Sequence, residues 1–238
     1  MKKKIVFIMN PISGTSSKAA VPSLIDSTLD KEQFEYEIKM TERPGHASEL
    51  AAEARDNHAD IVVAVGGDGT VNEVARSLVH SDSALGILPC GSGNGLARHL
   101  LLPMNLKKSI EIINACKIHD LDYGVINEYP FFCTCGMGFD AFVSMKFAES
   151  GKRGPISYAE NILREGLKYE PETYTLEDET GTKQYKAFLI SCANASQYGN
   201  NAYIAPQASM SDGLMDVVIM EPFDVIEASQ VSFDMFNK

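Results

Sequence analysis

The chain has little that would indicate a disulfide-bonded, zinc-binding or membrane-spanning protein. Its five cysteines are an odd number and none forms a C-x-x-C pair, so neither a disulfide framework nor a zinc site is predicted. The first apolar run, Ile5 to Met9, stops at Asn10-Pro11 and is too short for the core of a signal peptide. No other apolar run approaches the length of a membrane span. We therefore expect a cytoplasmic protein whose contact with a membrane is peripheral.

Positive charge is also scarce, with 21 Lys and Arg against 32 Asp and Glu, a formal net charge of −11. Nucleic-acid binding requires a cationic face, so no nucleic-acid partner is expected. The 238 residues are 45% hydrophobic and 22% charged, which excludes disordered and coiled-coil classes and provides for one large domain or two small ones.

The first half of the chain alternates short apolar runs with helical patterns. The expected elements are strands at 4–9, 34–40, 60–65 and 85–88, and helices at 18–29, 47–57 and 71–78. This alternation predicts a doubly wound α/β domain, with a parallel sheet between helices, over residues 1–118. Ligands bind such sheets at the carboxyl ends of the strands.

After residue 118 the strand patterns follow one another with few helices between them, which predicts an antiparallel β-rich domain over residues 119–238. The expected elements are strands at 122–126, 131–135, 173–177, 187–192 and 215–220, and helices at 139–148 and 157–167.

Glycine-rich loops follow the predicted strands of the first domain. The run Gly66-Gly67-Asp68-Gly69-Thr70 leads into a helix that carries Asn72 and Glu73. Glycines let the backbone approach a phosphate, and a carboxylate beside phosphates is useful as a Mg²⁺ partner or a proton acceptor. Taken alone, the motif is more typical of a tight strand-to-helix turn capped by Asp68, and the further loops described next favour the phosphate-binding interpretation.

Three further loops occupy equivalent positions, at Asn10–Gly14, Thr41–Ala47 and Pro89–Arg98. None is a Walker loop or a G-x-G-x-x-G fingerprint. Because the carboxyl ends of parallel strands meet at one edge of a sheet, the loops can line a single nucleotide-binding crevice.

These motifs, N-P-I-S-G, T-E-R-P-G-H-A, G-G-D-G-T-V-N-E and P-C-G-S-G-N-G-L-A-R, resemble those of the diacylglycerol kinase catalytic-domain family, which includes bacterial lipid kinases and sphingosine kinases. L-D-Y-G at 121–124 and S-D-G-L-M-D at 211–216 extend the resemblance over nearly the whole chain. It implies an ATP- and Mg²⁺-dependent lipid kinase with an N-terminal nucleotide-binding domain and a β-sandwich-like second domain.

The resemblance also implies functional residues. Those expected to bind ATP are Asn10, Pro11, Ser13, Gly14, Thr41, Gly66, Gly67, Asp68, Gly69, Thr70, Asn72, Glu73, Gly91, Ser92 and Asn94. Asp68 and Asp122 are expected near the catalytic Mg²⁺, and a structural Mg²⁺ is expected at Ser209, Asp212 and Leu214. For the last group, a simple hairpin turn remains an equal alternative.

The sequence departs from the family in one important respect, because the later D-G-E motif, which supplies an acid acting as general base in relatives, is absent. We therefore expect a chain truncated within its second domain, with Asp68 as the best remaining candidate for the base. The expected acceptor is diacylglycerol at a membrane surface, to give phosphatidic acid. A sphingoid-base kinase, an NAD kinase and a catalytically impaired nucleotide- or lipid-binding remnant are the alternatives, and a homodimer stays open.

Overall fold

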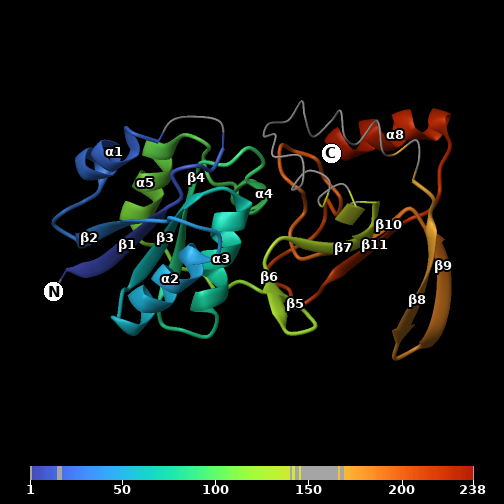
Figure 1. Ribbon diagram of the computed structural model, residues 1–238, viewed down its shortest axis with the longest axis horizontal. Coiled ribbons are helices and arrows are strands. Elements are labelled where there is room, and N and C mark those ends of the chain that lie inside the picture. Colours follow the sequence, from blue (N-terminus) through green and yellow to red (C-terminus); the bar gives the residue numbers. More distant parts are fainter. Residues whose placement is uncertain are drawn as a thin grey trace.

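The computed structural model describes residues 2–14, 18–139, 141, 142, 145, 166 and 169–237. Figure 1 shows two lobes side by side along the long axis, the first rich in helices and the second built mainly of strands and loops. Most of the two predicted helices at 139–148 and 157–167 lies outside the described residues. The boundary at residue 118 stays a prediction.

The first lobe contains a parallel sheet with strand order β2-β1-β3-β4. Its strands are β1 (Lys3–Met9), β2 (Phe34–Met40), β3 (Ile61–Gly66) and β4 (Ala84–Pro89). All four were predicted from the sequence to within one residue at each end. The apolar composition of the two central strands, β1 and β3, fits strands covered on both faces, whereas the edge strand β2 alternates buried or half-buried residues with exposed ones.

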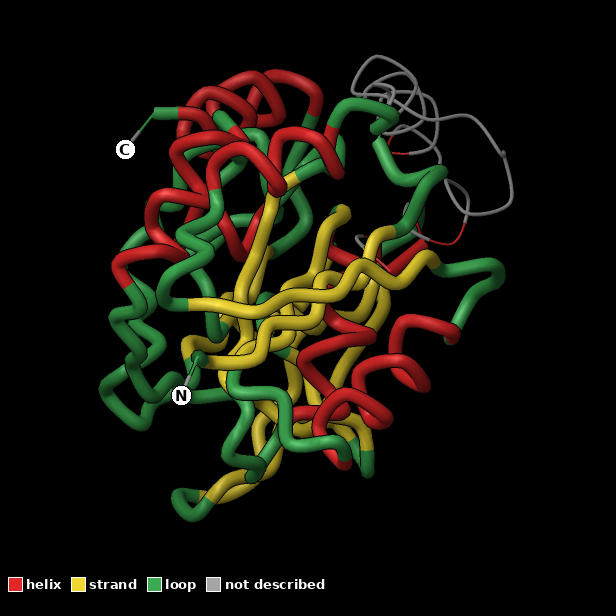
Figure 2. The backbone as a smooth tube through the Cα atoms, turned by 90° about the vertical axis from the view of Figure 1, so that its left-hand side faces the viewer, coloured by secondary structure: helices red, strands yellow, loops and turns green. Residues whose placement is uncertain are grey.

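Helices cover both faces of this sheet, as predicted for a doubly wound domain (Figure 2). Side chains of β1 alternate between the two layers, because successive residues of a strand point to opposite faces. Ile5 and Phe7 pack with α1 (Val21–Thr28) and α5 (Leu106–Ala115). Val6 and Ile8 pack with α2 (His46–Asp56) and α3 (Asp68–Leu78).

The second lobe is antiparallel, as predicted. Its central sheet has the order β11-β10-β7, formed by Asp216–Met220, Leu189–Ala193 and Thr134–Gly138. Two hairpins flank it, β5 (Gly124–Ile126) with β6 (Tyr129–Phe131), and β8 (Glu172–Asp178) with β9 (Gly181–Ala187). The chain then forms helix α8 (Val225–Phe236). None of the helices in the described part of the chain is long and apolar enough to cross a membrane.

Several elements were not predicted. Helices α4 (Gly95–His99), α5 and α8 were missed, as were strands β6 and β9. The single strand expected at 131–135 is divided between β6 and β7, and the one expected at 187–192 spans the end of β9 and most of β10. Helix α4 has only five residues, so it is too short to show a helical period in the sequence.

The two lobes share one apolar core. Ala195 and Met210 of the second lobe are fully or almost fully buried in the cluster that covers the α2/α3 face of the parallel sheet. Phe132 and Cys133 pack against the same cluster. In addition, the Tyr123 hydroxyl lies 2.9 Å from His80 Nε2. The second lobe is therefore held against the first by burial of apolar side chains.

Two glycine loops touch at the carboxyl edge of the parallel sheet. A Cβ atom built on Gly91 would lie 2.4 Å from the Cα atom of Gly67, so only glycine allows this approach. The contact brings the loop after β3 against the loop after β4.

We expect Gly91→Ala to destabilise the fold by about 1–3 kcal/mol, because its methyl group would overlap backbone that cannot move aside easily. Gly69→Ala is the matched control, since no atom lies within 4 Å of a Cβ placed there and the residue is helical. It should be neutral, or stabilising by about 0.5–1 kcal/mol. Urea unfolding of both variants measures the difference. Equal stability of the two variants would contradict the close contact.

Candidate functional site

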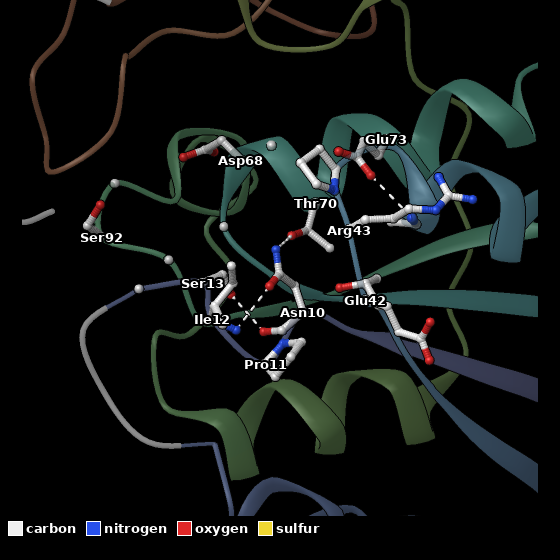
Figure 3. A pocket seen from close by; sticks show the side chains of 18 residues that line it. Asn10, Pro11, Ile12, Ser13, Glu42, Arg43, Asp68, Thr70, Glu73 and Ser92 are labelled. Carbon is white, nitrogen blue, oxygen red and sulfur yellow. Dashed lines mark hydrogen bonds between the residues drawn. The ribbon is translucent and has the colours of Figure 1, made fainter. Parts of the chain in front are cut away.

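Loops from four strand ends enclose a cleft of about 660 Å³ at the carboxyl edge of the parallel sheet (Figure 3). The lining residues are Asn10, Pro11, Ile12, Ser13, Gly14, Thr41, Glu42, Arg43, Pro44, Ala47, Gly67, Asp68, Gly69, Thr70, Glu73, Gly91, Ser92 and Gly93. The order β2-β1-β3 creates this opening, because the connections of β1 leave toward opposite sides of the sheet.

Asn10 fixes the loop after β1. Its side-chain amide donates to Thr70 Oγ1 at 3.3 Å, and its Oδ1 accepts the backbone N–H of Ile12 at 3.1 Å. Both contacts are visible in Figure 3. Close by, the buried ammonium group of Lys18 donates to the Ser13 carbonyl. Asn10 therefore connects this loop to the first turn of α3.

Glu73 holds the loop after β2. Its two carboxylate oxygens accept the backbone N–H groups of Gly45 at 3.1 Å and Ala47 at 3.2 Å. In addition, the Ser48 hydroxyl donates to the Glu73 carbonyl at 2.7 Å. Glu73 thus keeps the Thr41–Ala47 loop at the rim of the cleft.

Arg43 is the cationic side chain among the residues that line the cleft. Its guanidinium donates to Glu49 Oε2 at 2.6 Å, and both side chains are more than half exposed. An exposed ion pair of this kind contributes little to stability, so the guanidinium can exchange partners at low cost.

Asp68 lies at the end of the cleft nearest the second lobe. The backbone N–H of Leu96 donates to its Oδ1 at 3.4 Å. Burial raises the pKa of Asp68, although hydrogen bonds from the N–H groups of Leu96, Gly95 and Asn94 at the start of α4 act in the opposite direction. A carboxylate with a raised pKa binds a proton more readily than an ordinary aspartate, which suits a proton acceptor.

The second lobe closes this end of the cleft. The backbone N–H of Asn200 donates to the Gly93 carbonyl at 3.1 Å, and Arg98 Nε donates to the same oxygen at 3.0 Å. Burial, together with the negative charge of the nearby Asp68, raises the pKa of the Cys133 thiol to about 12. The thiol therefore stays protonated at neutral pH.

Asp122 meets the 209–214 loop rather than the cleft. Its Oδ2 accepts the backbone N–H of Gly213 at 2.8 Å, and Asp212 Oδ1 accepts that of Leu214 at 3.0 Å. Carboxylate, hydroxyl and carbonyl oxygens are the ligands that Mg²⁺ and Ca²⁺ prefer, so the chemistry of this loop fits a hard cation. Throughout the described residues, however, no three His, Cys, Asp or Glu side chains are grouped to hold a metal ion.

The structure brings most of the predicted ATP-binding residues together. Those outside the cleft lining are Gly66, Asn72 and Asn94. Asn94 instead braces its own loop, accepting the Gly91 N–H and donating to the Gly91 carbonyl. Ile12, Glu42, Arg43, Pro44, Ala47 and Gly93 line the cleft without having been predicted individually. All six lie within the motifs already identified, but the sequence does not show which residues of a motif face the cleft.

Comparison with known proteins agrees with this architecture. The diacylglycerol kinase catalytic domain matches residues 4–126, and the YegS C-terminal NAD kinase beta sandwich-like domain matches residues 133–234. The chain is 28% identical over 207 residues to "Probable lipid kinase YegS" of Escherichia fergusonii, covering 84% of this chain and 69% of that protein. It is 27% identical over 242 residues to a diacylglycerol kinase of Staphylococcus saprophyticus, covering 97% and 77% of the two chains.

A solved structure shows the same fold. The crystal structure of a diacylglycerol kinase from Bacillus anthracis has a TM-score of 0.71 and 19% sequence identity, covering 96% of this chain and 80% of that chain. The expected architecture, a parallel α/β domain followed by a β-sandwich-like domain, is confirmed. The chain belongs to the diacylglycerol kinase catalytic-domain family and is a phosphotransferase of the lipid kinase type.

Proposed function

We propose that the protein transfers the γ-phosphate of ATP to a lipid hydroxyl, with diacylglycerol as the acceptor and phosphatidic acid as the product. The observation that carries this proposal is the position of Asp68. It lies in a cleft built from four phosphate-type loops, at the end where the second lobe packs against the Gly93 loop. A lipid hydroxyl that enters from the second lobe would therefore meet the nucleotide beside a carboxylate.

Phosphoryl transfer depends mainly on positioning and on neutralising charge. The glycine-rich loops provide backbone N–H groups for the phosphates, and Arg43 provides a cation at the rim. Mg²⁺, when bound with the nucleotide, would neutralise phosphate charge, and Asp68 is one candidate carboxylate to hold it. If Asp68 does not bind the metal, it is instead the candidate proton acceptor for the lipid hydroxyl, a role that its raised pKa favours.

The direct test is phosphate transfer from labelled ATP by the purified chain in mixed micelles with Mg²⁺. Diacylglycerol, a sphingoid base and NAD serve as separate acceptors. We expect phosphorylation of diacylglycerol and a fall of at least about 100-fold in Asp68→Asn, since general-base help alone is worth about 10²- to 10⁴-fold. Transfer to NAD alone would contradict the proposal, as would activity unchanged by Asp68→Asn.

Glu73 should act as a positioning residue for the nucleotide. We expect Glu73→Ala to raise KM for ATP by about tenfold with a smaller change in kcat, because it releases the Gly45 and Ala47 N–H groups and frees the Thr41–Ala47 loop. Glu73→Gln keeps one acceptor oxygen and should recover part of the affinity. Steady-state kinetics with varied ATP measures both variants. A loss confined to kcat would instead place the Glu73 carboxylate in the chemical step.

The raised pKa of Asp68 has a measurable consequence for stability. A carboxyl whose pKa is higher in the folded state than in the unfolded state stabilises the fold below the unfolded value, near 3.8. This stability is lost as the pH rises through the folded-state pKa. Asp68→Asn should therefore be more stable than the wild type at neutral pH, with a difference that shrinks toward pH 4.

Urea unfolding across a pH series measures this difference. Asp26→Asn is the control of opposite sign, because hydrogen bonds from Lys31 and Tyr36 lower the pKa of Asp26. That variant should show no gain at neutral pH. If Asp68→Asn is less stable than the wild type at neutral pH, the Asp68 carboxylate is held as a favourable ion and not as a poised base.

A further inference from the structure

Leu101 breaks a local rule of helix termination. Helix α4 ends in a Schellman motif, in which the N–H of Leu101 donates to the Arg98 carbonyl at 3.1 Å and that of Leu102 to the Ala97 carbonyl at 2.8 Å. The residue after the C-cap in this motif is usually glycine, because its φ is positive. Here that residue is Leu101, with φ of 55°. The other non-glycine residues with positive φ in the described chain are Asn, His or Cys.

The side chain gains nothing from the protein in return for this conformation. Leu101 is 87% exposed, whereas its neighbours Leu100 and Leu102 are partly buried against the core cluster. Glycine would satisfy the same two hydrogen bonds with less strain. A single exposed apolar side chain is common on protein surfaces, but leucine with a positive φ is rare, and the two features together indicate a contact outside the chain.

The charge around Leu101 indicates the nature of that contact. Residues 83–110 contain no Asp or Glu, although the chain as a whole carries 32. The same stretch contains Arg98, Lys107 and Lys108, and the two lysines are exposed. In a protein of net charge −11, this is a segment that an anionic surface would attract. Exposed lysines in the same segment as an exposed apolar side chain match the headgroups and acyl chains of an anionic bilayer.

The position of α4 connects this contact to the catalytic cleft. The N–H groups at the start of α4 face Asp68, and Leu101 follows its other end. A five-residue helix is about 7.5 Å long, so Leu101 and the Asp68 carboxylate lie near opposite ends of one short helix. The polar layer of a bilayer is about 5–7 Å thick on each side. Figure 1 shows α4 on the side of the first lobe that faces the second.

We propose that Leu101, with Lys107 and Lys108, forms a membrane-docking tip that inserts into an anionic bilayer and holds the cleft at the headgroup layer. The biological role of this tip rests on the proposed function, whereas vesicle binding can be measured without any kinase activity. Insertion of one leucine, together with electrostatic attraction of two lysines to anionic headgroups, gives weak and reversible binding. Such binding suits an enzyme that must leave the membrane after each encounter.

The test is co-sedimentation of the full chain with vesicles of phosphatidylglycerol and phosphatidylcholine in equal parts, and with vesicles of phosphatidylcholine alone. Leu101→Gly should lower the partition coefficient by about tenfold or more. Its melting temperature should be unchanged or higher, because glycine relieves the positive φ. The paired variant Lys107→Gln/Lys108→Gln should lose the preference for anionic vesicles, by about fivefold per charge.

Ile118→Ser is the matched control, because Ile118 is an exposed aliphatic residue outside this tip. It should bind vesicles like the wild type. The proposal is overturned by equal binding of Leu101→Gly and the wild type, by an equal loss in Ile118→Ser, or by a fall in the melting temperature of Leu101→Gly. A change in oligomeric state without a change in vesicle binding would also overturn it, in favour of a second copy of the chain.

A dispersed short-chain diacylglycerol separates the docking proposal from the proposed function. Leu101→Gly should turn over this acceptor at the wild-type rate and lose activity only on vesicles. If the wild type phosphorylates neither form, the proposed function fails, while the sedimentation result still decides whether Leu101 docks on a bilayer.

Discussion

The contact on which the site depends is the one between the Asp68 carboxylate and the first N–H groups of α4. It ties the loop after β3 to the loop after β4, at the place where Gly67 and Gly91 already bring their backbones together. The same N–H groups limit the electrostatic cost of burying the carboxylate, and what remains of that cost raises the pKa of Asp68. This interaction therefore influences both the shape of the cleft and the pKa of Asp68.

The second lobe completes the site by closing one end of it. Its Asn200 N–H holds the Gly93 carbonyl, and Ala195 and Met210 enter the core that also supports α2 and α3. Apolar burial supplies most of the energy of such a junction, while the hydrogen bond fixes its register. The position of the second lobe relative to the cleft is thus determined by the packing of the two lobes and not by any single loop.

The elements of the first lobe could be predicted well because their signals are local. Strands β1 and β3 are short apolar runs, β2 alternates apolar and charged residues, and the loops that follow all four strands carry recognisable motifs. Helices α4 and α5 escaped prediction, the first because it is shorter than two turns. In the second lobe, the hairpin strands β6 and β9 were missed because pairing with a neighbour decides short strands more than their own composition does.

By itself, the sequence determined the doubly wound domain, the antiparallel second domain, the family and the four loops of the cleft, since periodicity and glycine-rich motifs are properties of neighbouring residues. Only the tertiary structure decided what individual side chains do. The Glu73 carboxylate accepts hydrogen bonds from two N–H groups of the Thr41–Ala47 loop, and the Asp122 carboxylate accepts one from the Gly213 N–H. Leu101 is exposed just after the end of α4. The physical reason is that hydrogen bonding and burial depend on residues 26 to 91 positions apart in the chain, as in the pairs Ala47–Glu73 and Asp122–Gly213, and spacing along a sequence does not reveal them.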